Sequence, residues 1–226
     1  NQTNQMSQTL SWIRQPSVPK SLTTDTLNPK AHKKLADAFD LFATEDELWV
    51  AGLAGLCECY DLDKPVIAAI NGDALGGWLE TVLACNLAVA VDTARLGLPE
   101  PRVGLCAHGG LHRLTRHLPG KTAARLALTG RLFSATEGKE MHLVNEVVPR
   151  EEFAAAIEDL VEDVLACAPL AIRATKQMMT QGLSAPDVEA AFAAKYPAYD
   201  RMLASKDALE GPNAFVEKRN PVWRGR

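Results

Sequence analysis

The sequence predicts an α/β protein, with an α/β core followed by a helical C-terminal region. Up to about residue 110, short apolar runs alternate with amphipathic segments, which is the pattern of strands and helices in a parallel sheet covered on both faces. Beyond that point helix-type periodicity dominates. The chain has 226 residues, which is enough to bury a sizeable core.

The N-terminal part is expected to contribute an edge strand, a helix and a short buried strand. The edge strand is expected at "TLSWIRQ" and is followed by a loop. Asn28 and Pro29 are residue types favoured at a helix N-cap and at the first helical position. Leu35, Phe39 and Phe42 then share one face of the helix. The buried strand is expected at "ELWVAGL", with a helix in "AGLCECYDLDK" after it.

The central segment alternates strands with a helix. The run "PVIAAI" is short enough, and sufficiently rich in apolar residues, to be a buried parallel strand. A helix is expected at "GGWLETVLAC", a second strand at "NLAVAVD", and a third strand that ends near Pro99. This order of strand, glycine turn, helix and strand supports a parallel sheet.

The C-terminal region has clear helix boundaries. A helix–turn–helix in "GLHRLTRHLPGKTAARLALTG" is expected to end at Gly130 as the C′ residue. Ser134 and Glu137 have the spacing of a capping box, and a brief strand is expected at "VNEVVP". The long helix that follows stops at Pro169, and helices continue to about Asp207, before an Arg- and Lys-rich end.

Composition narrows the function classes. The formal net charge of −4 gives no reason to expect nucleic acid or an anionic membrane as a partner. No apolar stretch is long enough to span a bilayer, and the polar start "NQTNQMSQTL" does not resemble a secretory signal. The five cysteines lack a disulfide framework and zinc spacing. We therefore expect reduced, mostly buried thiols in a soluble intracellular protein without a metal, in a compartment that the sequence does not specify.

The stretch "NGDALGGWLE" places two glycines where a strand ending at Ile70 gives way to a helix. The first N–H groups of a helix lack intrahelical partners and lie at the positive end of its dipole. Because Gly76 and Gly77 have no Cβ, a polarised oxygen can approach those donors closely. Glu80 follows about one turn later, at the same end of the helix.

A second acid, Glu100, stands just after the third of these predicted strands, in "LGLPEPRVGL". Parallel strands end at the same edge of a sheet, so Glu80 and Glu100 are expected to face one cavity there. Backbone donors with two carboxylates suit a reaction through an enolate: the N–H groups stabilise the oxyanion by roughly 3–4 kcal/mol each and the acids move protons. Each residue taken alone also has a structural explanation. The two glycines fit an ordinary loop, Glu80 fits an acid that favours the helix dipole, and Glu100 fits a solvated loop acid.

A dinucleotide-binding loop is the competing interpretation of the glycines. "GDALGG" follows a strand, and Asp92 lies twenty residues beyond Gly72. The glycines do not fit the G-x-G-x-x-G spacing, however. The enolate interpretation is therefore preferred.

A succession of motifs resembles the enoyl-CoA hydratase/isomerase (crotonase) superfamily from about Asn28 to the C-terminus. They are "DKPVIAAINGDALGGWLETVLACNLAVA", "LGLPEPRVGL", "GGLHRL", "LTGRLFSATEG", "LVNEVVP" and "APLAIRATKQM". The ending "SKDALEGPNAFVEKRNPVWRGR" is most similar to the carnitinyl-CoA dehydratase-like branch. The resemblance implies a crotonase-type ββα superhelix, with residues 1–130 carrying the active site and residues 131–226 forming a helical trimerisation region.

The resemblance also implies roles for single residues. Gly77 matches the oxyanion-hole glycine, while Glu80 and Glu100 match the two acids that activate water for addition at Cβ and protonate Cα. Lys218 matches a basic position near the CoA nucleotide. The implied substrate is an acyl-CoA thioester, with coenzyme A as part of the substrate and no further cofactor. The implied assembly is a homotrimer or a dimer of trimers.

Three departures from the family pattern affect the site. The segment between Ala51 and Ala54, where the second oxyanion N–H is expected, is shortened; either it is deleted or a loop is missing from the sequence, and the intact flanking motifs favour the second. Trp78 replaces a third glycine beside Gly76, and either shapes the acyl site or packs outward. His108 stands where small residues are usual, and is either a third titrating group or a surface histidine.

The function expected on this basis is that of an acyl-CoA hydratase or dehydratase. Retention of both acids favours this over a family isomerase, which usually keeps only the second acid. Isomerase or other enolate chemistry on the same fold remains an alternative. A non-catalytic binding protein is the other, and it is favoured if the segment after Ala51 is truly deleted.

Overall fold

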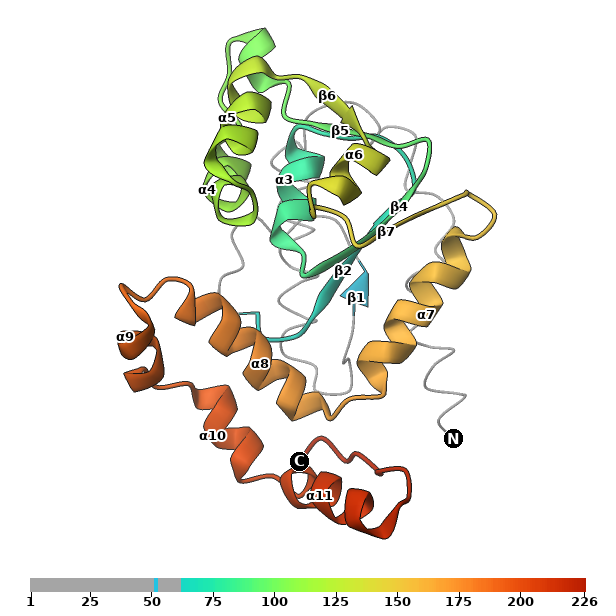
Figure 1. Ribbon diagram of the computed structural model, residues 1–226, viewed down its shortest axis with the longest axis vertical. Helices are drawn as coiled ribbons and strands as arrows, with labels where there is room; N and C mark the ends of the chain where they lie inside the picture. Colours follow the sequence, from blue (N-terminus) through green and yellow to red (C-terminus); the bar gives the residue numbers. More distant parts are fainter. Residues whose placement is uncertain (1–50, 53–61) are drawn as a thin grey trace, which may run out of the picture. The chain divides into compact units, whose positions relative to one another are not determined.

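The computed structural model describes residues 51–52 and 62–226 (Figure 1). The helices and the edge strand expected before residue 62 lie outside the described residues. The chain divides into two units, described separately below: unit 1 contains Asn1–Cys59 and Val66–Asp159, and unit 2 contains Tyr60–Pro65 and Leu160–Arg226. The boundary expected near residue 130 stays a prediction.

The first sheet of unit 1 has four parallel strands in the order β1-β2-β4-β7. Their bounds are Ala51–Gly52 for β1, Val66–Ile70 for β2, Leu87–Val91 for β4 and Glu146–Val148 for β7. In register, Ala68 pairs with Ala88. Most side chains of β2 and β4 are buried, which explains why both strands read as nearly continuous apolar runs. The strands predicted at these runs are confirmed.

A second sheet has three short strands in the order β3-β5-β6. They are Ala74–Leu75 for β3, Arg95–Gly97 for β5 and Leu132–Ser134 for β6. Strand β3 is parallel to β5, and β5 is antiparallel to β6. The chain therefore passes twice from the first sheet to the second and on to a helix, as β2-β3-α3 and as β4-β5-α4 (Figure 1). This repeated ββα turn is the superhelical architecture expected from the resemblance.

The helices of unit 1 position the glycine turn and its neighbours. They are Gly77–Ala84 for α3, the 3-10 helix Glu100–Val103 for η2, His108–His117 for α4, Gly120–Thr129 for α5 and Ala135–Glu140 for α6. Helix α5 ends at Gly130 in the left-handed conformation, with φ of 59°, as predicted. The capping box of Ser134 and Glu137 is also confirmed at the start of α6.

Unit 2 is helical. Helix α7, Phe153–Leu165, starts in unit 1 and ends in unit 2, and the others are Pro169–Gly182 for α8, Val188–Ala193 for α9, Pro197–Leu203 for α10 and Asp207–Glu217 for α11. The prediction that helices end near Asp207 is wrong, because α11 continues through Pro212. Pro212 lies inside this helix although proline removes one helical N–H donor.

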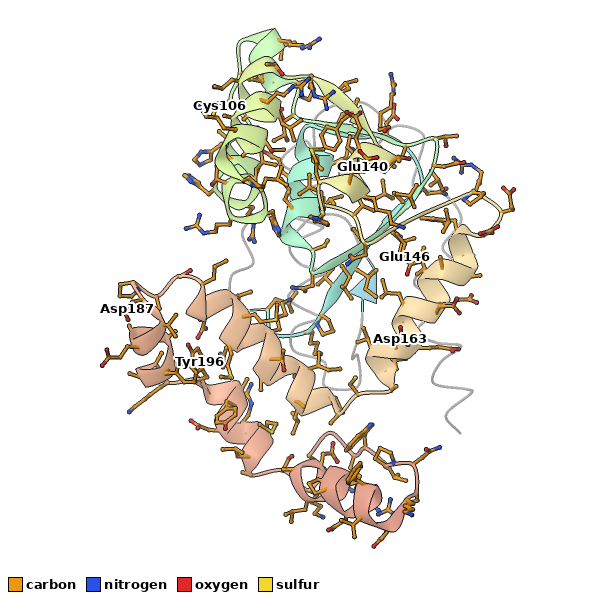
Figure 2. The ribbon with its side chains drawn as sticks, viewed as in Figure 1. Cys106, Glu140, Glu146, Asp163, Asp187 and Tyr196 are labelled. Carbon is orange, nitrogen blue, oxygen red and sulfur yellow. The ribbon has the colours of Figure 1, made fainter. Side chains whose placement is uncertain are left out.

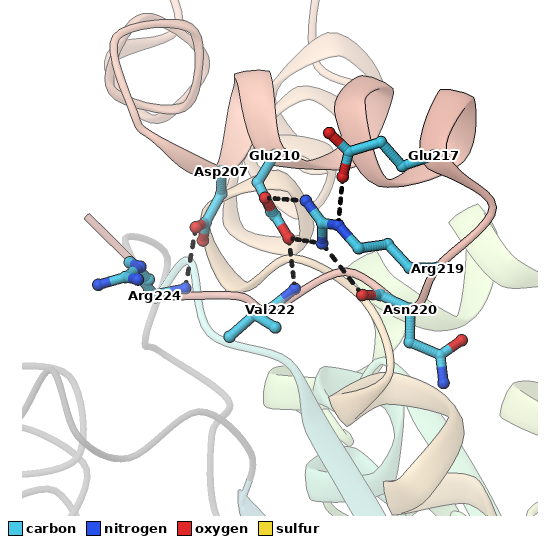
Figure 3. A network of polar contacts seen from close by, with 7 residues as sticks. All are labelled: Asp207, Glu210, Glu217, Arg219, Asn220, Val222 and Arg224. Atoms are coloured by element: carbon cyan, nitrogen blue, oxygen red, sulfur yellow. Dashed lines mark hydrogen bonds and ion pairs between the residues drawn. The ribbon is translucent and has the colours of Figure 1, made fainter.

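Helix α11 is held by the tail that follows it (Figure 3). The Glu210 carboxylate pairs with Arg219 and accepts the Val222 N–H. The buried Asp207 accepts the N–H groups of Arg224 and Gly225. Both acids are in the first turn of α11, so the tail and the helix stabilise each other.

The described cysteines are free, as expected, but not mostly buried. Cys85 is buried, whereas Cys106 and Cys167 are exposed; Cys106 lies on the loop before α4 (Figure 2). The expectation of buried thiols was therefore wrong for two of these three. Within residues 51–52 and 62–226, no helix is long and apolar enough to cross a membrane.

Candidate active site

The glycine turn joins strand β3 to helix α3. The Gly76 N–H donates to the carbonyl oxygen of Gly97 at 2.9 Å, which extends the pairing of β3 with β5 by one bond. Gly76 has φ of 60° and ψ of −129°, a conformation that side chains disfavour strongly. The sequence located the preceding strand end at Ile70, but the two-residue β3 lies between that strand and the turn.

Helix α3 begins at Gly77 without a side-chain cap. Its Glu80 N–H already bonds to the Gly76 carbonyl, as in an ordinary first turn. The Gly77 N–H has no acceptor among the residues that the structure describes. A free amide at the positive end of a helix is a donor for an anionic or polarised oxygen.

Glu80 is held by the start of a second helix. Its Oε1 accepts the Gly110 N–H at 3.0 Å, in the first turn of α4. Its Oε2 lies 3.9 Å from the point where a Cβ of Gly77 would stand. The N-terminus of α4 favours negative charge at this position, so the carboxylate is anchored on one oxygen and directed toward the glycine turn with the other.

Glu100 approaches the same turn from the segment that follows strand β5, which pairs with β3 in the second sheet. It opens η2, three residues after β5 ends at Gly97. Its Oε1 lies 3.0 Å from the point where a Cβ of Gly76 would stand. Its Oε2 is buried and has no hydrogen-bond partner among the described residues. A buried, unsatisfied carboxyl oxygen is costly to leave in an inert structure.

The environment of Glu100 favours its neutral form. Burial is the main cause that raises the pKa of the Glu100 carboxyl above its ordinary value, and repulsion from Glu80 raises it further. A hydrogen bond from its own backbone N–H opposes the shift. Desolvation and a like charge both disfavour the ionised carboxylate. The two acids are therefore in different environments although they share one turn.

Four of the predicted site residues are thus brought together: Gly76, Gly77, Glu80 and Glu100. Trp78 is half-buried in the first turn of α3, and its part in an acyl site stays a prediction. His108 is exposed as the first residue of α4, where it contacts the ring of His112 edge to face. Lys218 is the exposed C-cap of α11 in unit 2, and its contact with CoA stays a prediction.

Gly110 is the site residue that sequence reasoning missed. A Cβ at Gly110 would lie 3.0 Å from Cγ of Glu80 and 3.5 Å from Cδ1 of Leu83. Glycine therefore leaves room for the Glu80 side chain to lie against α4, where its Oε1 accepts the Gly110 N–H. The paired glycines in "HGGLHRL" were a visible signal, but a backbone donor has no side-chain signature.

The described residues offer amides and carboxylates rather than a metal site. Within them, no group of three or more His, Cys, Asp or Glu side chains is arranged to hold a metal ion. The segment in which the second oxyanion donor was expected lies mostly outside the described residues. Ala51 and Gly52 within it form β1.

The repeated ββα turn defines the class of protein as one with the crotonase fold. The chain belongs to the enoyl-CoA hydratase/isomerase family, whose family model matches residues 32–226. A carnitinyl-CoA dehydratase from Salmonella typhimurium strain LT2 is 40% identical over 189 residues, which are 81% of this chain and 72% of the relative.

Solved structures show the same similarity. An enoyl-CoA hydratase from Mycobacterium tuberculosis H37Rv superposes with a TM-score of 0.82 at 33% identity, covering 89% of this chain and 90% of the other. An enoyl-CoA hydratase from Bacillus anthracis has a TM-score of 0.82 at 30% identity, with 88% and 90% covered. The fold and the family expected from the sequence are confirmed.

Proposed function

We propose that this protein is a hydro-lyase that reversibly adds water to a 2-enoyl-CoA thioester through an oxyanion-stabilised enolate. Membership of the family and the dehydratase and hydratase relatives support this reaction class. The single observation that carries it is that Glu80 and Glu100 both approach the Gly76-Gly77 turn, where the Gly77 N–H has no acceptor among the described residues. An acyl thioester presents the carbonyl oxygen that such an amide stabilises.

In this reaction, Gly77 stabilises the oxyanion. Its N–H donates to the thioester oxygen as negative charge develops there, which contributes about 3 kcal/mol for one well-placed donor. The resemblance implies a second donor from the segment after Ala51, which lies mostly outside the described residues. Gly76 supports this role indirectly, because its N–H bond to Gly97 holds the turn in place.

The two acids carry out different proton transfers. In hydration, Glu80 holds the water and takes its proton as the water oxygen bonds to Cβ, and the Glu100 carboxyl delivers its proton to Cα. The free Oε2 of Glu80 and the raised pKa of Glu100 support this assignment. Dehydration runs the same steps in reverse, and a proton returns between the acids through solvent to complete the cycle.

Substitution of each acid by its amide tests the assignment. Glu80→Gln and Glu100→Gln are each expected to lose most hydration of crotonyl-CoA while binding a non-reactive CoA ester with near-normal affinity. Wild-type-like turnover in either variant refutes the assignment. A panel that adds carnitinyl-CoA and 3-enoyl-CoA esters then identifies the acyl group and separates hydration from double-bond isomerisation, the alternative that the family description includes.

We also propose that the protein is a homo-oligomer, a trimer or a dimer of trimers, in which Lys218 reaches the CoA nucleotide of a neighbouring subunit. Large apolar side chains exposed on unit 2 support self-association; they include Phe192, Leu209, Phe215 and Val216, each at least 70% exposed. Light scattering of the wild type and of Phe215→Glu tests this, and a monomeric wild type contradicts it.

A further inference from the structure

Arg102 lies on the same short helix as the proposed proton donor Glu100, two residues later. Its Nε donates a 3.0 Å hydrogen bond to the carbonyl oxygen of Thr129. Thr129 is the last residue of α5, and the last carbonyls of a helix lack intrahelical donors. A guanidinium at this end also complements the negative end of the helix dipole.

This hydrogen bond joins residues 99–105, here called the Glu100 turn, to helix α5. The other hydrogen bonds of residues 99–105 stay within the turn, as in Arg102 N–H to Pro99 and Leu105 N–H to Glu100. Within the part of the chain that the structure describes, only the Arg102 side chain joins these residues to another element by a hydrogen bond. The turn therefore depends on Arg102 and on packing for its position.

Gly130 makes room for this contact. It has φ of 59°, and a Cβ there would lie 3.0 Å from Cγ of Arg102, 3.4 Å from its Nε and 3.4 Å from Cα of Pro99. The end of α5 thus packs directly against the first part of the turn as well as accepting the hydrogen bond. A side chain at position 130 would therefore require Arg102 or Pro99 to shift.

We propose that Arg102 is a positioning residue, which fastens the Glu100 turn to the end of α5 and so keeps the Glu100 carboxyl against Gly76. The proposal rests on the proposed function, in which Glu100 donates a proton to the substrate. It goes beyond that function because it assigns a role to a residue that need not touch the substrate.

The geometry at Glu100 leaves little tolerance for movement. Oε1 lies 3.0 Å from the Cβ point of Gly76, and Oε2 is buried. A misplacement of about 1 Å at a reacting group lowers a rate by about 10²-fold. A turn that moves outward also exposes Glu100 to water, which reverses the burial that favours its neutral form.

The test replaces Arg102 by methionine, which keeps most of its length and removes the donor, and by lysine, which keeps a charge and one donor. We expect Arg102→Met to lower kcat for crotonyl-CoA hydration about 10- to 100-fold with KM changed less than about twofold. The high-pH limb of its kcat profile, and the carboxyl titration of Glu100 followed by ¹³C NMR, move to lower pH. Arg102→Lys recovers part of the loss.

Arg116→Met is the matched control, because among the described residues the Arg116 side chain bonds only the His112 carbonyl of its own helix. It is expected to behave as the wild type. If Arg102→Met keeps the wild-type kcat and pH profile while Glu100→Gln is inactive, the positioning role is wrong and the proposed function stands. If Arg116→Met loses as much activity as Arg102→Met, the effect is one of surface charge and the proposal also fails. Full activity of Glu100→Gln contradicts the proposed function itself.

Gly130→Ala supplies a second perturbation should Arg102→Met fold poorly. It retains the guanidinium but places a Cβ against it. We expect the same fall in kcat and the same shift of the pH profile. An unchanged kcat and profile in a folded Gly130→Ala variant contradicts the proposal.

Discussion

The Gly110 N–H donates a 3.0 Å hydrogen bond to Oε1 of Glu80, so the start of α4 anchors an acid carried by α3. The same glycine sits with its missing Cβ only 3.0 Å from Cγ of Glu80. Gly110 therefore provides both the hydrogen-bond donor to Glu80 and the space that the Glu80 side chain occupies. Because one carboxylate oxygen is occupied, the other is the one that remains for a water molecule.

Gly110→Ala is expected to displace Glu80. The added methyl group must push Cγ of Glu80 or move α4 away from α3, and overpacking of this kind typically destabilises by about 1–3 kcal/mol. A shift of Glu80 by about 1 Å lowers kcat by about 10²-fold. Hydration kinetics and thermal denaturation measure both effects. Gly120→Ala, at a helix position where a Cβ meets nothing within 4 Å, is the control; equal losses in both variants contradict the anchoring role.

Gly76→Ala tests the contact between the turn and Glu100. Position 76 combines φ of 60° with a Glu100 oxygen 3.0 Å from the Cβ point. Gly104 has φ of 77° but open space around it. Alanine at Gly104, which lies in the left-handed region, is expected to cost about 1–2 kcal/mol of unfolding free energy. Alanine at Gly76 is expected to cost more, because φ of 60° with ψ of −129° is a conformation that essentially only glycine adopts. Only Gly76→Ala is expected to lose most of kcat, and similar kcat values in the two variants contradict the contact.

The pH dependence of stability follows from the raised pKa of Glu100. A carboxyl that ionises less readily in the folded state stabilises the fold fully below its unfolded pKa, near the ordinary 4.5, and loses this contribution as pH rises through the folded pKa. Glu100→Gln removes the titration. Its Tm relative to the wild type is therefore expected to increase as pH rises from about 4.5 through the raised folded-state pKa of Glu100, and to level off above that pKa. A Tm difference that is independent of pH contradicts the raised pKa.

The C-terminal tail has the opposite pH response. Hydrogen bonds from Arg219 and then from the Val222 N–H lower the pKa of Glu210 to about 2, from an ordinary 4.5. Protection of residues 220–226 from hydrogen exchange is therefore expected to be full above the ordinary value and to fall as pH drops toward the lowered one. Glu210→Gln is expected to lose this protection at neutral pH. Glu189→Gln, at an exposed position on α9, is the control, and equal protection in both variants contradicts the network.

Local sequence signals predicted the elements that local chemistry determines. The buried strands β2 and β4, the capping box of α6 and the end of α5 at Gly130 all have such signals and were confirmed. Strand β3 was missed because two residues cannot show a period. Helix α11 was missed, because its sequence contains Pro212 and its stabilising contacts come from residues 219–225, which no local pattern indicates.

The candidate site divides in the same way. Glu80 and Glu100 were named from their positions after predicted strands, and the structure brings both to the glycine turn. The contacts made by Gly110 and by Arg102 span 30 and 27 residues. Neither has a sequence period or a motif that specifies its partner, so only the packed structure reveals them.

The most direct test of the central claim is a double-mutant cycle on hydration of a 2-enoyl-CoA thioester. If Glu80 and Glu100 act on one substrate as a unit, kcat of the Glu80→Gln/Glu100→Gln double variant is expected to be about as low as that of either single variant. Losses that multiply, as for two independent sites, contradict the claim, as does a single variant that turns over substrate like the wild type.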